Sequence, residues 1–231
     1  MKKILLISGH GQGDPGACAF GYQEADLTRE LVSLVRPKLS KYAEVTVFDT
    51  NKNPYKYFKN NSFNFKKYDY VVEYHFNAAV NDRIGDGKTT GTEILIHTTE
   101  KGYSVENAIL KRIEALGFRN RGVKTRNNLQ NMNLCKGNQG VSYALIETCF
   151  IDDKDDMKLY EQKKEAIAEA IAEGIAEGFK LSRKEESEMT LKDAKDILKN
   201  KVGLSDGTIT FLECYKYGED LIIKIAEATK K

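Results

Sequence analysis

Short apolar runs alternate with stripes of apolar residues at helical spacing along the first 181 residues of this chain. Each run has the length of a buried strand, and each stripe repeats every three to four residues, as in a helix that packs on a sheet. The predicted strands are Lys2–Ser8, Val45–Phe48, Asp69–His75, Thr92–His97 and Val141–Thr148, with a further short strand at Asn128–Leu134. The predicted helices are Glu24–Lys41, Tyr103–Leu116, Asp155–Tyr160 and Lys163–Leu181, with a short helix and loop in the lysine-rich, aromatic segment Asn53–Lys67. Strands that alternate with helices predict an α/β fold, a mostly parallel sheet covered by helices on both faces.

The pattern changes after residue 181. Residues 182–189 are polar and charged, which is typical of a linker. Residues 190–231 show one apolar face within 191–198 and another within 221–226, and Thr190 and Ser205 have the character of helix caps, which together predict three short helices. About 40 residues is near the lower size limit for a domain that folds alone. We therefore predict a main domain at 1–181, a linker at 182–189 and a small helical domain at 190–231.

Composition restricts the class of protein. Hydrophobic residues make up 41% and charged residues 30%, as in a soluble globular protein. The formal net charge of +2 argues against a nucleic-acid partner, which calls for a basic patch or stripe. No apolar run reaches the ~18 residues of a membrane span. The chain begins with a strand and no leader, so we expect the protein to be made and kept in a cytoplasm. The four cysteines are far apart, which predicts free thiols.

Two imidazoles and two carboxylates carry the candidate chemistry. His10, His75 and Glu147 each lie at or just past the end of a predicted strand, and Glu24 opens the helix behind the first strand. The carboxyl ends of parallel strands share one edge, where open α/β sheets build their sites. Two histidines and one carboxylate are a sufficient shell for a catalytic zinc with one position left for water. The other carboxylate would then serve as the base.

Three neighbouring polar residues have simpler expected roles. Asp14 caps the turn after His10 or orients that ring by accepting its second N–H. Asn77 holds the loop after His75 or contacts substrate, and we expect the first of these roles. His97 also ends an apolar run, and we expect it to be structural or to lie at the rim of the site.

The motifs resemble the zinc-dependent N-acetylmuramoyl-L-alanine amidases of the type-3 family. That family places a Gly-His pair, an Asp-Pro-Gly-Ala turn, a lone Glu, a His-x-Asn-Ala motif and a late Glu in this order. Here they are Gly9-His10, Asp14-Pro15-Gly16-Ala17, Glu24, His75-Phe76-Asn77-Ala78 and Glu147, and Asn120–Lys124 is similar to the family's Arg-Gly-Val-Lys segment. The resemblance covers about residues 2–180, and its compact plan is most similar to catalytic domains of endolysins from phages of Gram-positive bacteria.

The resemblance implies the role of each site residue. His10, Glu24 and His75 would hold Zn²⁺, and Glu147 would take a proton from water and pass it to the leaving amine. The substrate would be peptidoglycan, cut between N-acetylmuramic acid and L-alanine. A phage enzyme of this kind stays in the host cytoplasm until a membrane-permeabilising protein releases it. A bacterial autolysin or a sporulation amidase with the same chemistry is the alternative.

Two rival functions remain open at the level of sequence. Cys149 follows Glu147 by two residues, so both would lie on one strand face, and His75 could serve as the base of a cysteine hydrolase. The chain could also be a non-catalytic wall-binding protein. The helices of 190–231 would bind wall carbohydrate, pair two copies in a homo-oligomer, or pack on the main domain. Phe211, Tyr215 and Tyr217 suit sugar stacking, but we expect them to form the core of so small a unit.

Overall fold

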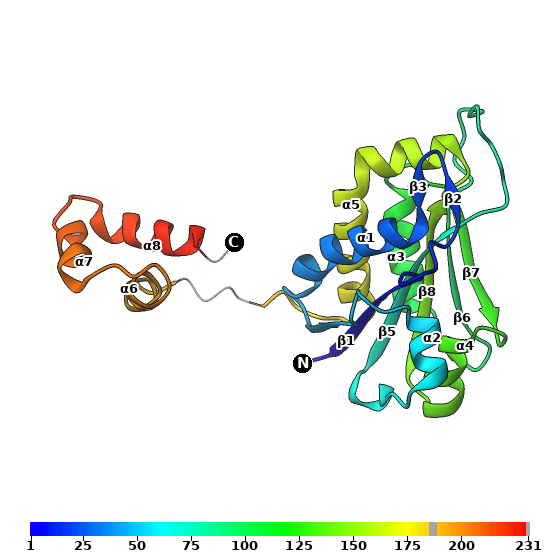
Figure 1. Ribbon diagram of the computed structural model, residues 1–231, viewed down its shortest axis with the longest axis horizontal. Helices are drawn as coiled ribbons and strands as arrows, with labels where there is room; N and C mark the ends of the chain where they lie inside the picture. The colour runs from blue at the N-terminus through cyan, green and yellow to red at the C-terminus, as the bar shows by residue number, and fades with distance from the viewer. Residues whose placement is uncertain (185–188, 230–231) are drawn as a thin grey trace. The chain divides into compact units, whose positions relative to one another are not determined.

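A six-stranded sheet organises the first part of the chain, in the order β4-β1-β5-β8-β6-β7 (Figure 1). The computed structural model describes residues 1–184 and 189–229. The strands of the sheet are β1 (Lys3–Ser8), β4 (Glu44–Val47), β5 (Tyr70–Asn77), β6 (Thr92–His97), β7 (Asn120–Arg126) and β8 (Ser142–Phe150). Strands β4, β1, β5 and β8 are parallel, whereas β6 pairs antiparallel with β8 and parallel with β7. The predicted mostly parallel sheet is confirmed.

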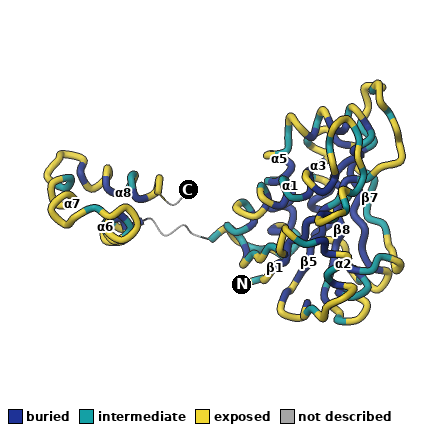
Figure 2. The backbone as a smooth tube through the Cα atoms, in the orientation of Figure 1, coloured by how far each residue is buried: buried dark blue, intermediate teal, exposed yellow. Residues whose placement is uncertain are grey.

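Two layers of helices cover the sheet, as the sequence predicts. Helices α1 (Glu24–Leu39), α3 (Ser104–Glu114) and α5 (Lys154–Gly178) lie on one face (Figure 1). The short helices α2 (Pro54–Asn60) and α4 (Gln130–Met132), with the helical turns η1 (Phe65–Lys67) and η2 (Asn133–Gly137), lie on the other. Because side chains alternate along a strand, Ile4 and Leu6 of β1 enter the first layer while Leu5 and Ile7 enter the second. Both faces of the central strands are therefore buried (Figure 2).

The predicted strand at Asn128–Leu134 is wrong, because this segment forms α4 and continues into the π-helical turn η2. Met132 and Cys135 are both buried against the second face of the sheet. A spacing of three residues places both on one side of a helical turn, whereas in a strand they would point to opposite faces. The apolar segment was too short for the spacing of its residues to distinguish a helix from a strand in the sequence.

Two further differences from the sequence prediction concern α5 and β7. The helices predicted at Asp155–Tyr160 and Lys163–Leu181 form one helix, α5, because Glu161 and Gln162 between them are strong helix formers. Strand β7 was not predicted, since its sequence is charged and contains Gly122. As an edge strand it pairs with β6 alone and needs no apolar run. A small hairpin, β2 (Cys18–Ala19) with β3 (Tyr22–Gln23), precedes α1.

The chain divides into two compact units, Met1–Arg183 and Lys184–Lys231. The second unit contains α6 (Leu191–Asn200), α7 (Asp206–Glu213) and α8 (Gly218–Ala228), in agreement with the three expected helices. Thr190 and Ser205 cap α6 and α7, each accepting from a backbone N–H three residues on. Of the predicted linker 182–189, residues 185–188 lie outside the described residues. In the described part of the chain, no helix is long and apolar enough to cross a membrane.

The aromatic residues of the second unit do not form its core, contrary to expectation. Phe211, Tyr215 and Tyr217 are 62%, 55% and 68% exposed. Aliphatic side chains and Met189 fill the interior instead, between the apolar faces of the three helices. The core residues are Met189, Ala194, Leu198, Ile209, Ile222 and Ala226.

Candidate metal centre and active site

His10 lies in the loop that follows β1, and a carboxylate fixes its ring. Its Nδ1–H donates to Asp14 Oδ2 over 3.0 Å. The other oxygen of Asp14 accepts from the Gly16 N–H at 3.1 Å, and Asn53 donates to Asp14 at 3.1 Å. Asp14 thus fills both roles expected from the sequence, the turn cap and the orienting acceptor. The Nε2 atom of His10 is left to face the interior of the site.

Glu24, the first residue of α1, lies between the two histidines. The residue is only 4% exposed. Its Oε2 is 3.1 Å from His10 Nε2, and its Oε1 is 2.9 Å from His75 Nδ1. The backbone N–H groups of Ala17 and Phe76 donate to the same carboxylate at 2.9 and 3.0 Å. These bonds fix Glu24 from the loop and from β5, so it is not a solvated first-turn carboxylate.

His75, near the end of β5, is held from its far side by a residue that the sequence did not single out. Its Nε2–H donates to Glu73 Oε1 at 2.9 Å. Glu73 is buried and accepts from Asn131 at 3.0 Å and from the Tyr143 hydroxyl. Since side chains two apart share a face of a strand, a Glu two residues before a candidate ligand was the available signal.

Two glycines make room for this arrangement. A Cβ at Gly9 would lie 2.4 Å from the His75 ring, and one at Gly16 would lie 2.6 Å from Glu24 Oε2. Gly16 also has φ +68°, a region that other residues rarely adopt. Any larger side chain at either position would separate the histidines from Glu24.

The donor set of His10, Glu24 and His75 fits a divalent metal ion. One ligand atom from each residue lies within 4.8 Å of the other two. Two imidazole nitrogens and one carboxylate oxygen are ligands that zinc accepts, and both ring orientations are fixed by carboxylates, as is usual for metal-binding histidines. Burial disfavours charge on His75, but Glu24 and Glu73 outweigh it and raise the pKa of His75 well above its usual value. The cluster is thus rich in negative charge and favours a cation.

Glu147 on β8 completes the group. It is the register partner of His75 on the neighbouring strand. Its Oε2 is buried and has no hydrogen-bond partner within the described residues. Burial is the main reason that its pKa rises to about 7; His75 opposes this rise and Glu24 adds to it. A buried carboxyl oxygen without a partner, next to a candidate metal site, is placed to bind something that is not protein.

A pocket of about 300 Å³ opens beside the cluster, on the face covered by α2 and α4. His10, Glu73 and His75 lie in its wall, together with Tyr55 from α2 and Leu145 from β8. The pocket therefore gives access to the side of the cluster that faces α2 and α4.

Residues 4–177 match the family model of the N-acetylmuramoyl-L-alanine amidases. The chain belongs to this family. It is 30% identical over 168 residues to the endolysin of Bacillus phage SPP1, which covers 70% of this chain and 59% of the endolysin. It is 27% identical over 191 residues to the Staphylococcus aureus protein named "Probable autolysin PH", covering 72% of this chain and 37% of that protein. The chain thus spans less than two thirds of the length of either relative.

Solved structures give the same family. The first unit, Met1–Arg183, which we call the amidase unit, is similar to a proposed N-acetylmuramoyl-L-alanine amidase from Neisseria meningitidis, at 28% identity and a TM-score of 0.60. The match covers 79% of this chain and 98% of that structure. The predicted resemblance to the type-3 amidases is confirmed.

His97 lies at the other end of the sheet from the candidate metal site, because its strand runs in the opposite direction. Because β6 is antiparallel to β8, its last residue, His97, lies at the edge of the sheet opposite Glu147. The ring is buried beside Thr99 Oγ1, 2.8 Å from Nδ1. Its expected structural role agrees with this contact. Asn77 also keeps its expected role, since its side chain accepts from the Ala78 N–H at 2.9 Å in the loop after β5.

Cys149 does not share a face with Glu147, contrary to expectation. The register of β5 and β8 shifts after the His75–Glu147 pair, so that β8 has one extra residue there. Cys149 consequently lies in the helix-covered core with Tyr74 and Phe76. Burial raises the pKa of the Cys149 thiol well above its usual value. This environment suits an inert core residue and not a nucleophile.

The antiparallel direction of β6 also brings a further carboxylate, which the sequence did not reveal, to the end of the sheet that holds the candidate site. Glu93, at the start of β6, is the register partner of Glu147. It is buried, and Arg121 and Lys124 of β7 donate to its carboxylate at 2.6 and 2.5 Å. The Arg121 guanidinium also lies over the Phe150 ring. The Arg-Gly-Val-Lys segment therefore bonds to the residue beside the candidate base.

Proposed function

We propose that this chain hydrolyses the amide bond between N-acetylmuramic acid and L-alanine in peptidoglycan. The main support is one juxtaposition: His10, Glu24 and His75 turn ligand atoms toward one another, and the neighbouring strand presents the unpartnered carboxyl oxygen of Glu147. Membership of the amidase family gives the reaction class. The metal, the base and the substrate below are parts of this proposal.

In this mechanism His10, Glu24 and His75 hold Zn²⁺. A bound zinc ion supplies Lewis acidity, which makes water a nucleophile near neutral pH and polarises the scissile carbonyl. Asp14 and Glu73 keep the two rings in the tautomers that leave Nε2 of His10 and Nδ1 of His75 free for the ion. Glu147 accepts the proton of the attacking water and returns it to the amine of L-alanine as the C–N bond breaks. No covalent enzyme intermediate is needed.

A test of this function identifies the new chain ends released from purified cell walls. We expect free L-alanine amino ends and intact lactyl groups, with lysis lost after chelation and restored by zinc. His10→Ala and His75→Ala should lose bound metal and wall lysis together. Cys149→Ala is the matched control, because a cysteine hydrolase would lose all activity whereas the metal enzyme keeps it. New reducing ends in place of amino ends, or full lysis by metal-free protein, would refute the proposal.

We further infer that the chain acts as an endolysin, which stays inside the host bacterium until the membrane is permeabilised. Both the motif pattern and the phage SPP1 endolysin support this inference. The similarity to "Probable autolysin PH" supports the alternative, a bacterial autolysin. Expression inside Gram-positive cells separates them: an endolysin should leave the cells intact until the membrane is permeabilised, whereas an autolysin should lyse them without this step.

For the second unit, we propose that its exposed aromatic side chains place the enzyme on wall carbohydrate. Exposed apolar patches mark interaction sites, and rings with one open face suit the apolar face of a sugar. Pairing of two chains through these helices is the second candidate, favoured by the same exposed surface. The solution mass of the protein and its binding to walls distinguish these two roles.

A further inference from the structure

The proposed function leaves unused the lysine-rich segment between β4 and β5. Residues 50–68 contain five lysines and six aromatic residues, but no Asp, Glu or Arg. The whole chain carries a formal net charge of +2, so a segment that contributes +5 leaves −3 for the rest. This segment therefore has a net positive charge, whereas the rest of the chain is net negative.

Three exposed lysines of this segment have no carboxylate partner among the described residues, in contrast to some lysines elsewhere in the chain. Lys38 lies 2.7 Å from Glu165, and Lys164 lies 2.6 Å from Glu30. Lys52 has Asp49 at 3.5 Å, but exposed Lys56, Lys59 and Lys67 have no carboxylate within 4.0 Å among the described residues. Lys59 and Lys67 lie over aromatic rings instead, those of Tyr55 and Phe63. Their charges remain available to a ligand.

These side chains lie on or beside α2. Lys56 and Lys59 are three residues apart on this helix, the spacing of neighbours on one side, and Lys52 lies two residues before its first residue. Lys52 and Lys56 line a hollow of about 390 Å³ together with Gln12. Lys59 lines a second hollow of about 390 Å³ near the end of α2, and Lys67 lies over the ring of Phe63 in its wall. We call Lys52, Lys56, Lys59 and Lys67 the basic face.

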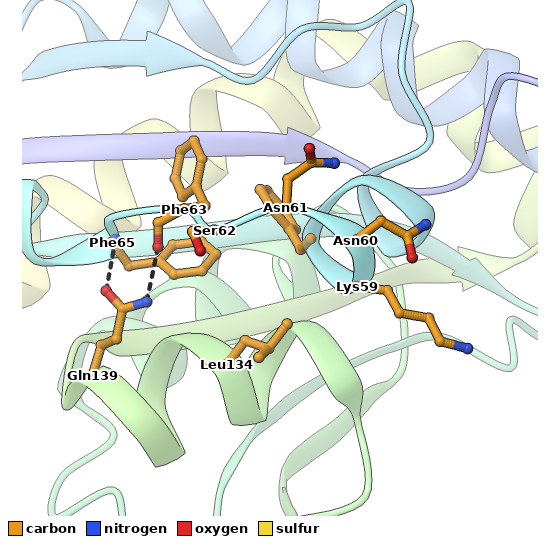
Figure 3. A pocket seen from close by; sticks show the side chains of 9 residues that line it. Lys59, Asn60, Asn61, Ser62, Phe63, Phe65, Leu134 and Gln139 are labelled. Carbon is orange, nitrogen blue, oxygen red and sulfur yellow. Dashed lines mark hydrogen bonds between the residues drawn. The ribbon is translucent and has the colours of Figure 1, made fainter.

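The second hollow has a fixed wall. Gln139 accepts from the Phe65 N–H and donates to the Phe63 carbonyl, both at 2.9 Å, and so ties the loop to the segment after η2 (Figure 3). Phe63 and Leu134 supply apolar surface, and Asn60, Asn61 and Ser62 supply polar groups at the rim. A ligand with both hydroxyl groups and charges matches this lining.

We propose that the basic face binds an anionic polymer of phosphodiester-linked polyol units in the cell wall. Several lysine charges along one surface suit a polymer with one negative charge per repeat better than they suit a single small anion. Carboxylates are typically recognised by the bidentate fork of arginine, which this segment lacks, whereas lysine binds phosphate as a point charge. None of the four lysines lines the pocket beside the metal cluster. This surface would hold the amidase unit on the wall independently of the peptidoglycan that it cuts.

The test measures binding of the full chain to synthetic poly(glycerol phosphate) at increasing salt concentration. The variant Lys56→Gln, Lys59→Gln, Lys67→Gln should bind about tenfold more weakly or worse at low salt. The slope of log Kd against log salt concentration should fall by about two, near 0.7 per lost contact. The matched control, Lys101→Gln, Lys111→Gln, Lys158→Gln, removes the same charge from exposed positions near or on α3 and α5 and should bind like the parent. Equal loss in both variants, or no loss in the first, would overturn the proposal.

Three further measurements make the result specific. Replacement of the same three lysines by Arg keeps the charge and should retain binding, which excludes misfolding as the cause of a loss. Duplex DNA and vesicles with anionic lipid should bind more weakly than the polyol phosphate; stronger binding of either would overturn the proposal in favour of that partner. Hydrolysis of soluble muramyl-peptide fragments should be unchanged in the Gln variant. If the parent itself fails to cleave these fragments, the proposed function fails while the binding result stands.

Discussion

At the scale of single residues, the two candidate metal-binding histidines are built alike. Each ring directs one nitrogen at Glu24 and donates its other N–H to a second carboxylate, Asp14 for His10 and Glu73 for His75. These outer carboxylates fix the tautomer and make the ring a better ligand. Their removal should therefore weaken metal binding without abolishing it.

This leads to a prediction for Asp14→Asn and Glu73→Gln. Each variant should bind zinc roughly 10- to 100-fold more weakly than the parent, as measured by competition with a chromogenic chelator. Asp69→Asn is the control, because Asp69 is an exposed carboxylate paired with Lys2. Unchanged zinc affinity in both site variants would show that Asp14 and Glu73 serve only the fold.

The two central carboxylates should differ in what their loss removes. Glu147→Gln keeps the shape of the side chain but cannot accept a proton, so zinc should remain bound while turnover falls by roughly two to four orders of magnitude. Glu24→Ala should instead reduce metal content, because Glu24 contacts both histidines. Metal analysis and wall turnover of the two variants check this. Loss of zinc from Glu147→Gln but not from Glu24→Ala would mean that the two roles are exchanged.

The sequence predicted the candidate residues that follow parallel strands, since that edge can be inferred without knowing the strand order. Glu73 and Glu93 were missed for different reasons. Glu73 lies inside an apolar run, where its partners Asn131 and Tyr143 come from segments that no local pattern connects. Glu93 reaches the site only because β6 runs against β8, a direction that the sequence does not encode locally.

At the scale of elements, long periodic segments were predicted well and short ones poorly. The stripe of Leu27, Leu31 and Val35 placed α1 within two residues of its ends, because its apolar face repeats over four turns. The segment Asn128–Leu134 offered too few apolar positions to distinguish a helix from a strand. Strand β7 has no apolar pattern, since its pairing with β6 and its contacts with Glu93 hold it in place.

One buried carboxylate joins three of these elements. Asp156, in the first turn of α5, accepts from the Phe150 N–H at the end of β8 at 2.8 Å and from the Gly91 N–H before β6 at 3.0 Å. Burial raises its pKa to about 6, although these hydrogen bonds oppose the rise. The folded chain therefore holds a proton on Asp156 between about pH 4 and 6 that the unfolded chain releases.

The contribution of Asp156 to stability should therefore depend on pH. A raised carboxyl pKa means that Asp156 contributes less stability as the pH rises from about 4 to 6, with a loss of about 3 kcal/mol and no further change above. Urea unfolding of the parent and of Asp156→Asn at several pH values checks this, because all other titrating groups cancel in the difference. The free energy of unfolding of the parent, relative to the variant, should fall across this window. A difference that is flat or rises with pH would contradict the assigned pKa.

At the scale of the whole molecule, the second unit presents aromatic surface that its own fold does not require. Its core consists of aliphatic residues and Met189, and the rings of Phe211 and Tyr215 pack edge to face on the surface with their centroids 5.4 Å apart. A second binding unit on the same chain raises the local concentration of the enzyme at its substrate without new contacts in the active site. The expected benefit is thus confined to substrates that are large enough to engage both units.

The variant Phe211→Ala, Tyr215→Ala, Tyr217→Ala should therefore lyse whole cells and sediment with walls less well than the parent. It should cleave soluble muramyl-peptide fragments at nearly the parental rate, because no ring of this set lies in the amidase unit. Val202→Ala, Leu221→Ala is the control, since it removes exposed apolar area from the same unit without removing a ring. Truncation to residues 1–183 should match the triple variant. If the triple variant instead halves the solution mass with unchanged sedimentation on walls, the rings pair two chains. Equal lysis, sedimentation and mass in all four proteins would leave the second unit without a targeting or assembly role.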